Sequence, residues 1–61
     1  MCEFEVLLKE KVVFKDAIYA KVEGNKVIVR DVIGTSKVFE NHKITEIDVS
    51  SERLTLSSIK T

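Results

Sequence analysis

Hydrophobic and polar residues alternate along much of the chain, a pattern typical of strands that bury one face. Residues 18–23 place apolar side chains at every second position, and the β-branched run 26–30 follows directly after Gly24-Asn25. A two-residue Gly-Asn step between two such runs is a strong hairpin signal, because glycine supplies the positive φ that a tight reverse turn needs. The pattern therefore predicts a β-hairpin centred on Gly24-Asn25.

The first segment of the chain fits two templates. A helical face would contain Phe4, Leu7, Leu8 and Val12, but it would also contain Lys11. A strand face contains Cys2, Phe4, Val6 and Leu8 without a polar exception. The β-branched and aromatic residues at positions 12–14 favour the strand. We predict a strand over residues 2–9, a turn at Glu10-Lys11 and a short second strand at 12–14.

The rest of the chain predicts further short strands separated by polar turns. These are a turn at 32–36, a strand at 37–40, a turn at 41–43, a strand at 44–49 with a bend or 3₁₀ turn at 43–46, a turn at 50–53, a strand at 54–56 and a frayed tail at 57–61. Strands at this spacing predict an all-β domain spanning residues 1–61. The expected architecture is a small SH3-like or Sm-like barrel of five to six short antiparallel strands, whose edge strands can pair with a second copy.

The composition of the chain limits the ways in which such a domain can be stabilised, and it indicates the cellular compartment. A chain of 61 residues buries about 60% of the surface that its unfolded form exposes, so packing, association or a metal must compensate. Cys2 is the single cysteine, which excludes an internal disulfide and suits a reducing compartment. The first five residues do not resemble a signal peptide, and no stretch approaches the ~18 apolar residues of a membrane span. We predict a cytoplasmic protein.

The charge balance argues against a nucleic-acid partner. Ten basic and ten acidic side chains cancel, and the lysines are spread along the sequence. Nucleic-acid affinity comes largely from cations that displace the counterions of phosphates. The three phenylalanines, Phe4, Phe14 and Phe39, are expected in the core, which leaves Tyr19 alone for base stacking. We therefore expect no specific RNA or DNA binding.

The sequence also contains no set of residues that is typical of a catalytic site. His42, the single histidine, lies in a predicted turn and is interpreted as a solvated residue, with a metal or partner contact as the alternative. Glu46 and Asp48 are two residues apart and are interpreted as the exposed face of a strand. The chain has no Gly-rich phosphate loop and no zinc-finger spacing. We predict a binding protein that is not an enzyme.

Cys2 is the residue with the most distinctive chemistry. A side chain as small as cysteine at position 2 permits removal of Met1, which leaves an α-amine and a thiol on the same residue. Together they form a five-membered chelate ring, and the deprotonated backbone nitrogen of Glu3 closes a second ring. Such N,S donors suit square-planar Ni(II) or Cu(II), and two chains related by a two-fold axis can complete the coordination. The alternative is that Cys2 packs as a small hydrophobe beside Phe4 and Val6.

Several of these features together resemble one known family. They are the Met1-Cys2 start, the alternating first strand, the hairpin at Gly24-Asn25, the Asp31 to Gly34 segment and the late runs 47–49 and 54–56. In these features the chain resembles the CooT family of small nickel-binding proteins. The resemblance implies a compact SH3-like barrel that forms a homodimer and binds Ni(II) through Cys2, with the backbone of Glu3 as a second ligand.

The resemblance leaves three functions to compare. Family members with a nickel role assist the assembly of carbon monoxide dehydrogenase, which implies a metalloenzyme maturation partner. Related chains are also described as RNA-binding proteins, which implies an SH3-like or Sm-like RNA-binding module. The third possibility is a protein-interaction module without a metal. Because Cys2 carries the most specific part of the resemblance, we expect metal binding.

Overall fold

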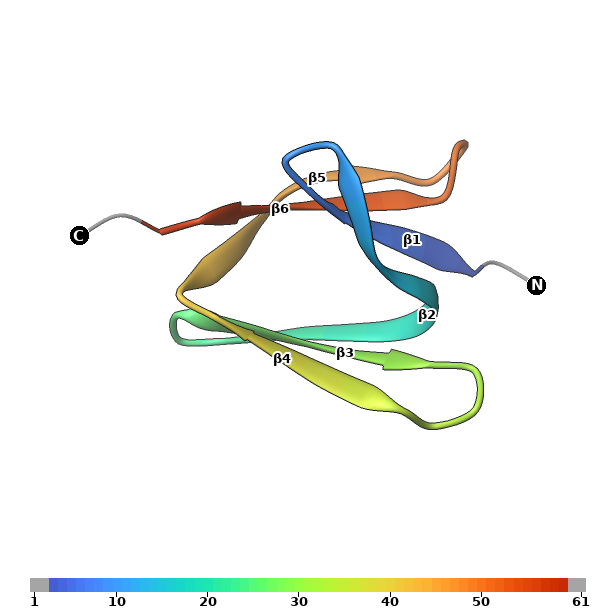
Figure 1. Cartoon of the computed structure of the whole chain (residues 1–61), viewed down its shortest axis with the longest axis horizontal. Helices are drawn as coiled ribbons and strands as arrows, with labels where there is room; N and C mark the ends of the chain where they lie inside the picture. Colours follow the sequence, from blue (N-terminus) through green and yellow to red (C-terminus); the bar gives the residue numbers. More distant parts are fainter. Residues whose placement is uncertain (1–2, 60–61) are drawn as a thin grey trace.

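A computed structural model describes residues 3–59 and places six strands in one sheet. The strands are β1 (Phe4–Leu8), β2 (Lys11–Glu23), β3 (Lys26–Asp31), β4 (Ser36–Glu40), β5 (His42–Asp48) and β6 (Arg53–Ser58). Their order across the sheet is β4-β3-β2-β1-β6-β5 (Figure 1). The described residues contain no helix that could cross a membrane.

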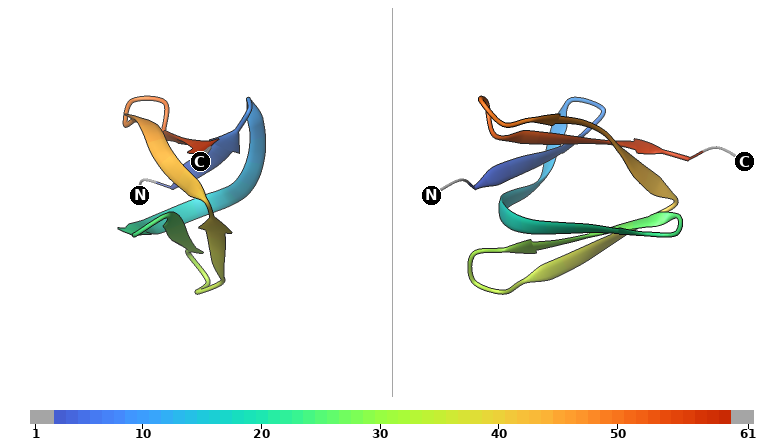
Figure 2. Two further views of the ribbon diagram at one scale, coloured as in Figure 1. Left: turned by 90° about the vertical axis from the view of Figure 1, so that its left-hand side faces the viewer. Right: turned by 180° about the vertical axis from the view of Figure 1, so that it is seen from behind.

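The sheet is folded into two layers by the long strand β2. The amino-terminal half of β2 pairs with β1, and the carboxyl-terminal half pairs with β3. Ala17 belongs to both pairings, because it lies opposite Phe4 on one side and opposite Asp31 on the other. Asp16, next to it, has a φ of +59°, and the register shifts nearby, as in a β-bulge that bends a strand. Both views in Figure 2 show β2 passing from one layer to the other.

The core lies between the two layers. Its buried side chains come from five of the six strands, and they are Val6, Ala17, Val27, Val29, Phe39, Leu54 and Leu56. Phe4, Leu8, Val13, Phe14 and Ile44 pack against them as half-buried neighbours. The expectation that all three phenylalanines face the core is confirmed, and Tyr19 is exposed as predicted.

The sequence-based predictions of strand, hairpin and fold class are largely confirmed. The first segment is a strand and not a helix, and the chain turns at Gly24-Asn25 with Gly24 at a φ of +58°. The fold is all-β with six strands. The sheet does not close into a barrel, so the SH3-like or Sm-like type stays a prediction.

Three local predictions in the first half of the chain are wrong. Residues 12–14 and 18–23 are one strand, β2, because the bulge beside Asp16 bends the strand without ending it. The preceding turn is Lys9-Glu10, where both residues have a positive φ, in place of Glu10-Lys11. The strands are also not all antiparallel, because β1 pairs with β6 in parallel.

Two predictions in the second half of the chain are also wrong. The periodicity slip at 43–46 is a β-bulge between Ile44 and Glu46 within β5, in place of a bend or 3₁₀ turn. The tail was expected to be frayed from residue 57, but Ser57 and Ser58 pair with β5. The backbone N–H of Ile59 then donates to the carbonyl of Asn41 at 2.8 Å.

Asp48 stabilises the turn between β5 and β6. Its Oδ1 accepts hydrogen bonds from the Ser50 hydroxyl at 2.8 Å and from the Ser51 backbone N–H at 3.3 Å. These bonds, that of Ser50 first, lower the pKa of the Asp48 carboxyl. The ionised carboxylate therefore holds this turn in place at neutral pH.

Candidate functional site

The predicted metal ligands, Cys2 and Glu3, directly precede β1 in the sequence. Cys2 lies outside the described residues, so its coordination stays a prediction. Glu3 is half-buried and comes directly before Phe4, the first residue of β1. Phe4 lies opposite Ala17, so Glu3 comes just before the place where β1 meets the bend of β2.

A polar hollow of about 310 Å³ adjoins Glu3. Its lining is made of charged and polar side chains, namely Glu3, Glu5, Lys15, Asp16, Ser51, Glu52 and Arg53. The wall is fixed by a backbone hydrogen bond of 2.9 Å from the N–H of Glu5 to the carbonyl of Glu52. Four acidic side chains and two basic ones line the hollow, so the lining has an excess of negative charge.

No second cluster of metal ligands exists within residues 3–59. In that part of the chain, no group of three or more His, Cys, Asp or Glu side chains is arranged to hold a metal ion. The carboxylates around Glu3 are therefore not a preformed site by themselves. Metal binding by the thiol, the amine and the backbone nitrogen of residues 2 and 3 stays a prediction.

His42 has a structural role different from the predicted solvated turn. It is the first residue of β5 and is half-buried. Its Nδ1–H donates to the carbonyl of Glu40 at 2.7 Å, and its ring meets Phe39 edge-on at 6.1 Å between centroids. The turn itself is Asn41, which has a φ of +61°. These contacts orient the imidazole toward the β4–β5 corner.

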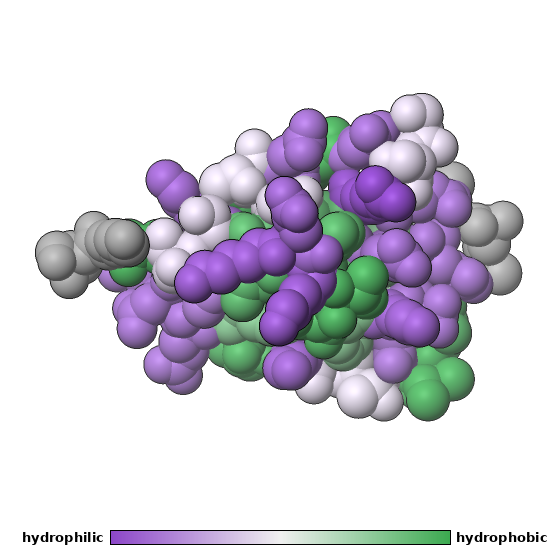
Figure 3. Space-filling model, turned by 45° about the horizontal axis from the view of Figure 1, so that its top comes forward, coloured by the Kyte–Doolittle hydropathy of each residue, from purple (hydrophilic) through white to green (hydrophobic). Residues whose placement is uncertain are grey.

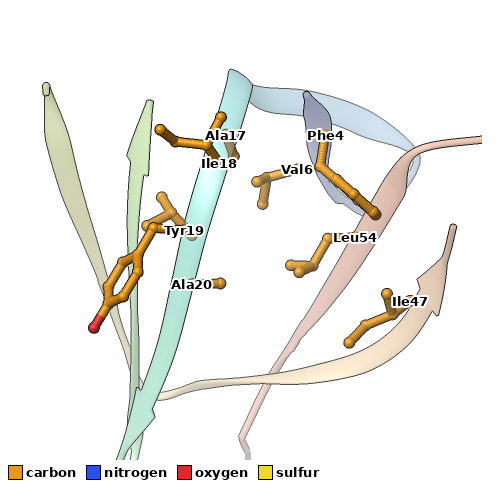
Figure 4. A pocket seen from close by; sticks show the side chains of 9 residues that line it. Phe4, Val6, Ala17, Ile18, Tyr19, Ala20, Ile47 and Leu54 are labelled. Carbon is orange, nitrogen blue, oxygen red and sulfur yellow. The ribbon is translucent and has the colours of Figure 1, made fainter. Parts of the chain in front are cut away.

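An apolar hollow of about 360 Å³ lies on the open side between the two layers. Its walls come from five strands, with Phe4, Val6, Ala17, Ile18, Tyr19, Ala20, Val29, Ile47 and Leu54 as lining residues. Figure 4 shows Phe4, Leu54 and Ile47 on one side and the residues of β2 on the other. Ile18 and Ile47 remain more than half exposed at its rims. The apolar hollow therefore extends from Phe4, at the amino-terminal end of β1, to the exposed apolar side chains of Ile18 and Ile47.

Apolar side chains also reach the surface elsewhere. Figure 3 shows hydrophobic residues grouped at the centre of one face and framed by hydrophilic residues. Exposed positions include Ile33, which is 84% exposed in the β3–β4 loop, and Val49 in the β5–β6 turn. Ile33 lies outside the lining of the apolar hollow and provides a control position for substitutions there.

The cations on the outer face of β2 and β3 are engaged by neighbours. Lys21 pairs with Glu23 at 3.0 Å, and the hydrogen bond between them raises the pKa of Lys21 and lowers the pKa of Glu23. The guanidinium of Arg30 lies 4.3 Å from the centre of the Tyr19 ring, which points away from the apolar hollow (Figure 4). The single exposed aromatic ring thus already has a cation on its face.

Sequence reasoning missed the apolar hollow. Ile18 and Ile47 were assigned to strand faces, but nothing in the alternation indicated that these faces would remain uncovered. The bend in β2 separates the layers and leaves that side open, and a bulge of one residue has no reliable sequence signal. The clearest available hint was Asp16 within a run of apolar and β-branched residues.

Comparison with known proteins gives one family. The family model described as CooT, the CO dehydrogenase accessory protein CooT, matches residues 1–57 of the 61-residue chain. The match includes both predicted ligand positions and all described strands except the last residue of β6. No curated protein sequence matches significantly.

Proposed function

Since the chain belongs to the CooT family of CO dehydrogenase accessory proteins, we propose that it binds Ni(II) through Cys2 at a homodimer interface and serves metalloenzyme maturation in the cytoplasm. CO dehydrogenase depends on nickel, so an accessory protein that handles this ion is chemically suited to its assembly. The ion is the cargo, and the protein is not an enzyme. The observation that carries the proposal is Met1-Cys2 within a family match of 57 residues.

The donor set suits nickel better than a hard cation. After removal of Met1, the α-amine and the thiolate of Cys2 close a five-membered ring on one ion. Nitrogen and thiolate sulfur are preferred by Ni(II) and Cu(II), whereas carboxylate and carbonyl oxygens suit Mg²⁺ and Ca²⁺. The deprotonated backbone nitrogen of Glu3 adds a third donor. The carboxylates near Glu3 do not form a metal cluster with each other, which is consistent with this assignment.

A second chain completes the coordination. A square-planar ion takes four donors, and one amino terminus supplies at most three that bind strongly. Two amino termini related by a two-fold axis supply two identical sets. The apolar hollow beside Phe4 supports association, because uncovered apolar surface near a ligand site favours a partner. The same surface favours the second candidate function, a protein-interaction module without metal.

Removal of Met1 should be required for strong binding. In the processed chain the α-amine and the thiol share Cys2, whereas retained Met1 moves the free amine one residue away and destroys the five-membered ring. We expect calorimetric titration with Ni(II) at pH 7.5 to give tight binding for the processed chain and much weaker binding for the unprocessed chain.

The matched control for this titration is His42→Ala. The imidazole is held by Glu40 and Phe39, so its loss should leave nickel affinity unchanged within a factor of about two. Equal affinity for the processed and unprocessed chains, or a large loss in His42→Ala, would contradict the amino-terminal chelate.

A further inference from the structure

The loop between β3 and β4 is held in one shape by Asp31. The Asp31 Oδ1 accepts hydrogen bonds from the backbone N–H of Ile33 at 3.1 Å and from that of Thr35 at 2.8 Å. The Asp31 backbone N–H donates to the Thr35 carbonyl at 2.9 Å, and the Asp31 carbonyl accepts from the Gly34 N–H at 3.1 Å. Three consecutive N–H groups of the loop therefore donate to one residue, and the loop is preorganised.

The side chain at the tip of this loop is apolar and uncovered. Ile33 is 84% exposed, more than any other large hydrophobic residue within residues 3–59. Val32, beside it, is also exposed. Single apolar side chains are common on protein surfaces. Ile33 differs because its backbone is fixed by the bonds to Asp31 while its side chain remains in water.

The β3–β4 loop lies at the end of the molecule where β1 begins. Ala17 lies opposite Phe4 on one side and opposite Asp31 on the other. Paired Cα atoms are about 5 Å apart, so Phe4 and Asp31 are about 10 Å apart across β2. Figure 1 and the right-hand view of Figure 2 both show this loop, the start of β1 and the β5–β6 turn at the same end. The exposed tip is therefore on the same end as Glu3.

The polar hollow gives this end an excess of negative charge. Four acidic and two basic side chains line it, and one of them, Asp16, is next to Ala17 in the bend of β2. An anionic lipid surface repels such a patch. A protein surface that carries lysine and arginine residues attracts it and orients the encounter. The charges therefore favour a basic protein surface over a membrane.

A second copy of the chain is not the occupant that the tip fits. The apolar hollow beside Phe4 is the place within residues 3–59 that could receive an isoleucine, and Ile33 is not part of its lining. Ile33 seated in the hollow of another copy makes a head-to-tail contact, which generates rings or open chains and not a two-fold pair. The shared ion of the proposed function requires a two-fold pair. The tip therefore suits a different protein.

We propose that the β3–β4 loop docks the chain onto the nickel-free metalloenzyme that receives the ion. Ile33 enters an apolar pocket on that enzyme, and basic residues around the pocket face the polar hollow. The identity of the acceptor, CO dehydrogenase, rests on the proposed function. Because the loop and Glu3 share one end of the molecule, an ion bound next to Glu3 lies at the contact with the acceptor.

A single apolar anchor with a charged surround suits a contact that must form and then dissociate. Binding energy in interfaces is concentrated in a few side chains that fill pockets, with polar groups around them. A preorganised loop loses little conformational entropy when it binds. Transient complexes bury less than about 1,200 Å² in total. A transfer protein needs this kind of contact, since it must release the acceptor after the ion has moved.

Binding of the processed full-length chain to purified nickel-free CO dehydrogenase tests the docking loop. With Ile33→Ala we expect the dissociation constant, measured by biolayer interferometry, to rise at least about tenfold, or about 1.4 kcal/mol. The matched control is Val22→Ala, because Val22 is 55% exposed and lies near the Gly24-Asn25 turn at the opposite end (Figure 1). Its affinity should equal that of the parent. No loss in Ile33→Ala, an equal loss in both variants, or no binding by the parent would overturn the proposal.

A pair of glycine variants tests the shape of the loop without changing a charge. Gly34 has a φ of +93° and Gly24 a φ of +58°, and a Cβ added at either position meets no atom within 4 Å. Alanine therefore strains the backbone at both positions without a clash. Gly34→Ala should weaken enzyme binding about threefold or more, whereas Gly24→Ala should not. Equal affinity of the two variants would contradict docking by the preorganised loop.

The salt dependence of the same binding tests the basic character of the acceptor surface. The association rate should fall as the salt concentration rises from ~0.05 to ~0.5 M, because salt screens attraction between exposed charges. Ile33→Ala removes no charge, so its association rate should fall by the same factor. An association rate that does not change with salt would overturn the charge complementarity.

Nickel titration and sedimentation equilibrium of Ile33→Ala separate the docking loop from the proposed function. We expect this variant to bind Ni(II) and to associate with itself as the parent does. Weaker self-association with unchanged enzyme binding would assign the tip to a second copy and overturn the proposal. If the parent docks through Ile33 but binds no nickel, the proposed function fails and the docking loop stands. If nickel binds at Cys2 but Ile33→Ala docks as the parent does, the docking loop fails and the proposed function stands.

Discussion

Cys2→Ser should abolish Ni(II) binding by the processed chain. The hydroxyl of serine stays protonated near neutral pH and is a hard donor, so the chelate loses its soft anionic sulfur. Serine is also small, so Met1 is still removed and the α-amine is preserved. Calorimetric titration should detect no binding in the range where the parent binds tightly. Equal affinity for Cys2→Ser and the parent would mean that Cys2 is a packed strand residue.

The same chemistry predicts a steep pH dependence of nickel affinity. The reference pKa values are about 8.5 for a thiol and ~7.7–8.0 for an α-amine, and both groups must lose a proton to bind. Affinity should therefore rise from about pH 6 to pH 8. A flat profile would indicate carboxylate ligands, which are already ionised over this range.

The largest expected effect on stability comes from Leu56→Ala. Leu56 is 2% exposed in β6, and its strand lies between β1 and β5. Replacing a buried leucine by alanine costs about 2–5 kcal/mol, because the removed methyl groups leave a cavity. A domain of this size has a total stability of roughly 3–9 kcal/mol, from ~0.05–0.15 kcal/mol per residue. We expect chemical denaturation to show most of the stability lost.

The control for this substitution is Ile33→Ala. Ile33 is exposed in the β3–β4 loop, and surface substitutions of this kind stay within about 0.5 kcal/mol. A comparable loss of stability in both variants would mean that the β6 core contacts do not dominate the fold. A Leu56→Ala chain as stable as the parent would contradict the arrangement of the core.

The parts of the fold that the sequence predicted are those specified by local chemistry. Gly24-Asn25 can form a tight turn wherever it occurs, and the alternation in residues 18–23 is unaffected by distant contacts. The parallel pairing of β1 with β6 depends instead on a meeting of residues about 48 apart, as Val6 and Leu54 show. No local pattern encodes the direction of such a partner. The bulges that bend β2 and β5 were equally invisible as separate features.

The candidate site likewise has one part that the sequence predicted and another part that it did not. Cys2 was identifiable because its chemistry follows from its position in the sequence and from the likeness to a family. The apolar hollow was not identifiable, because it arises where the pairing of β2 passes from β1 to β3 at Ala17. Alternation shows that Ala20 and Val22 share a face with the core. It does not show that the core ends before reaching them.

Native mass spectrometry of the processed chain, with and without Ni(II), tests the central claim most directly. It reports removal of Met1, the number of chains and the number of bound ions in one spectrum. We expect a dimer of the 6.9 kDa chain, less Met1, that carries one nickel ion and loses it in Cys2→Ser. A processed chain that retains no nickel at pH 7.5 would contradict the claim.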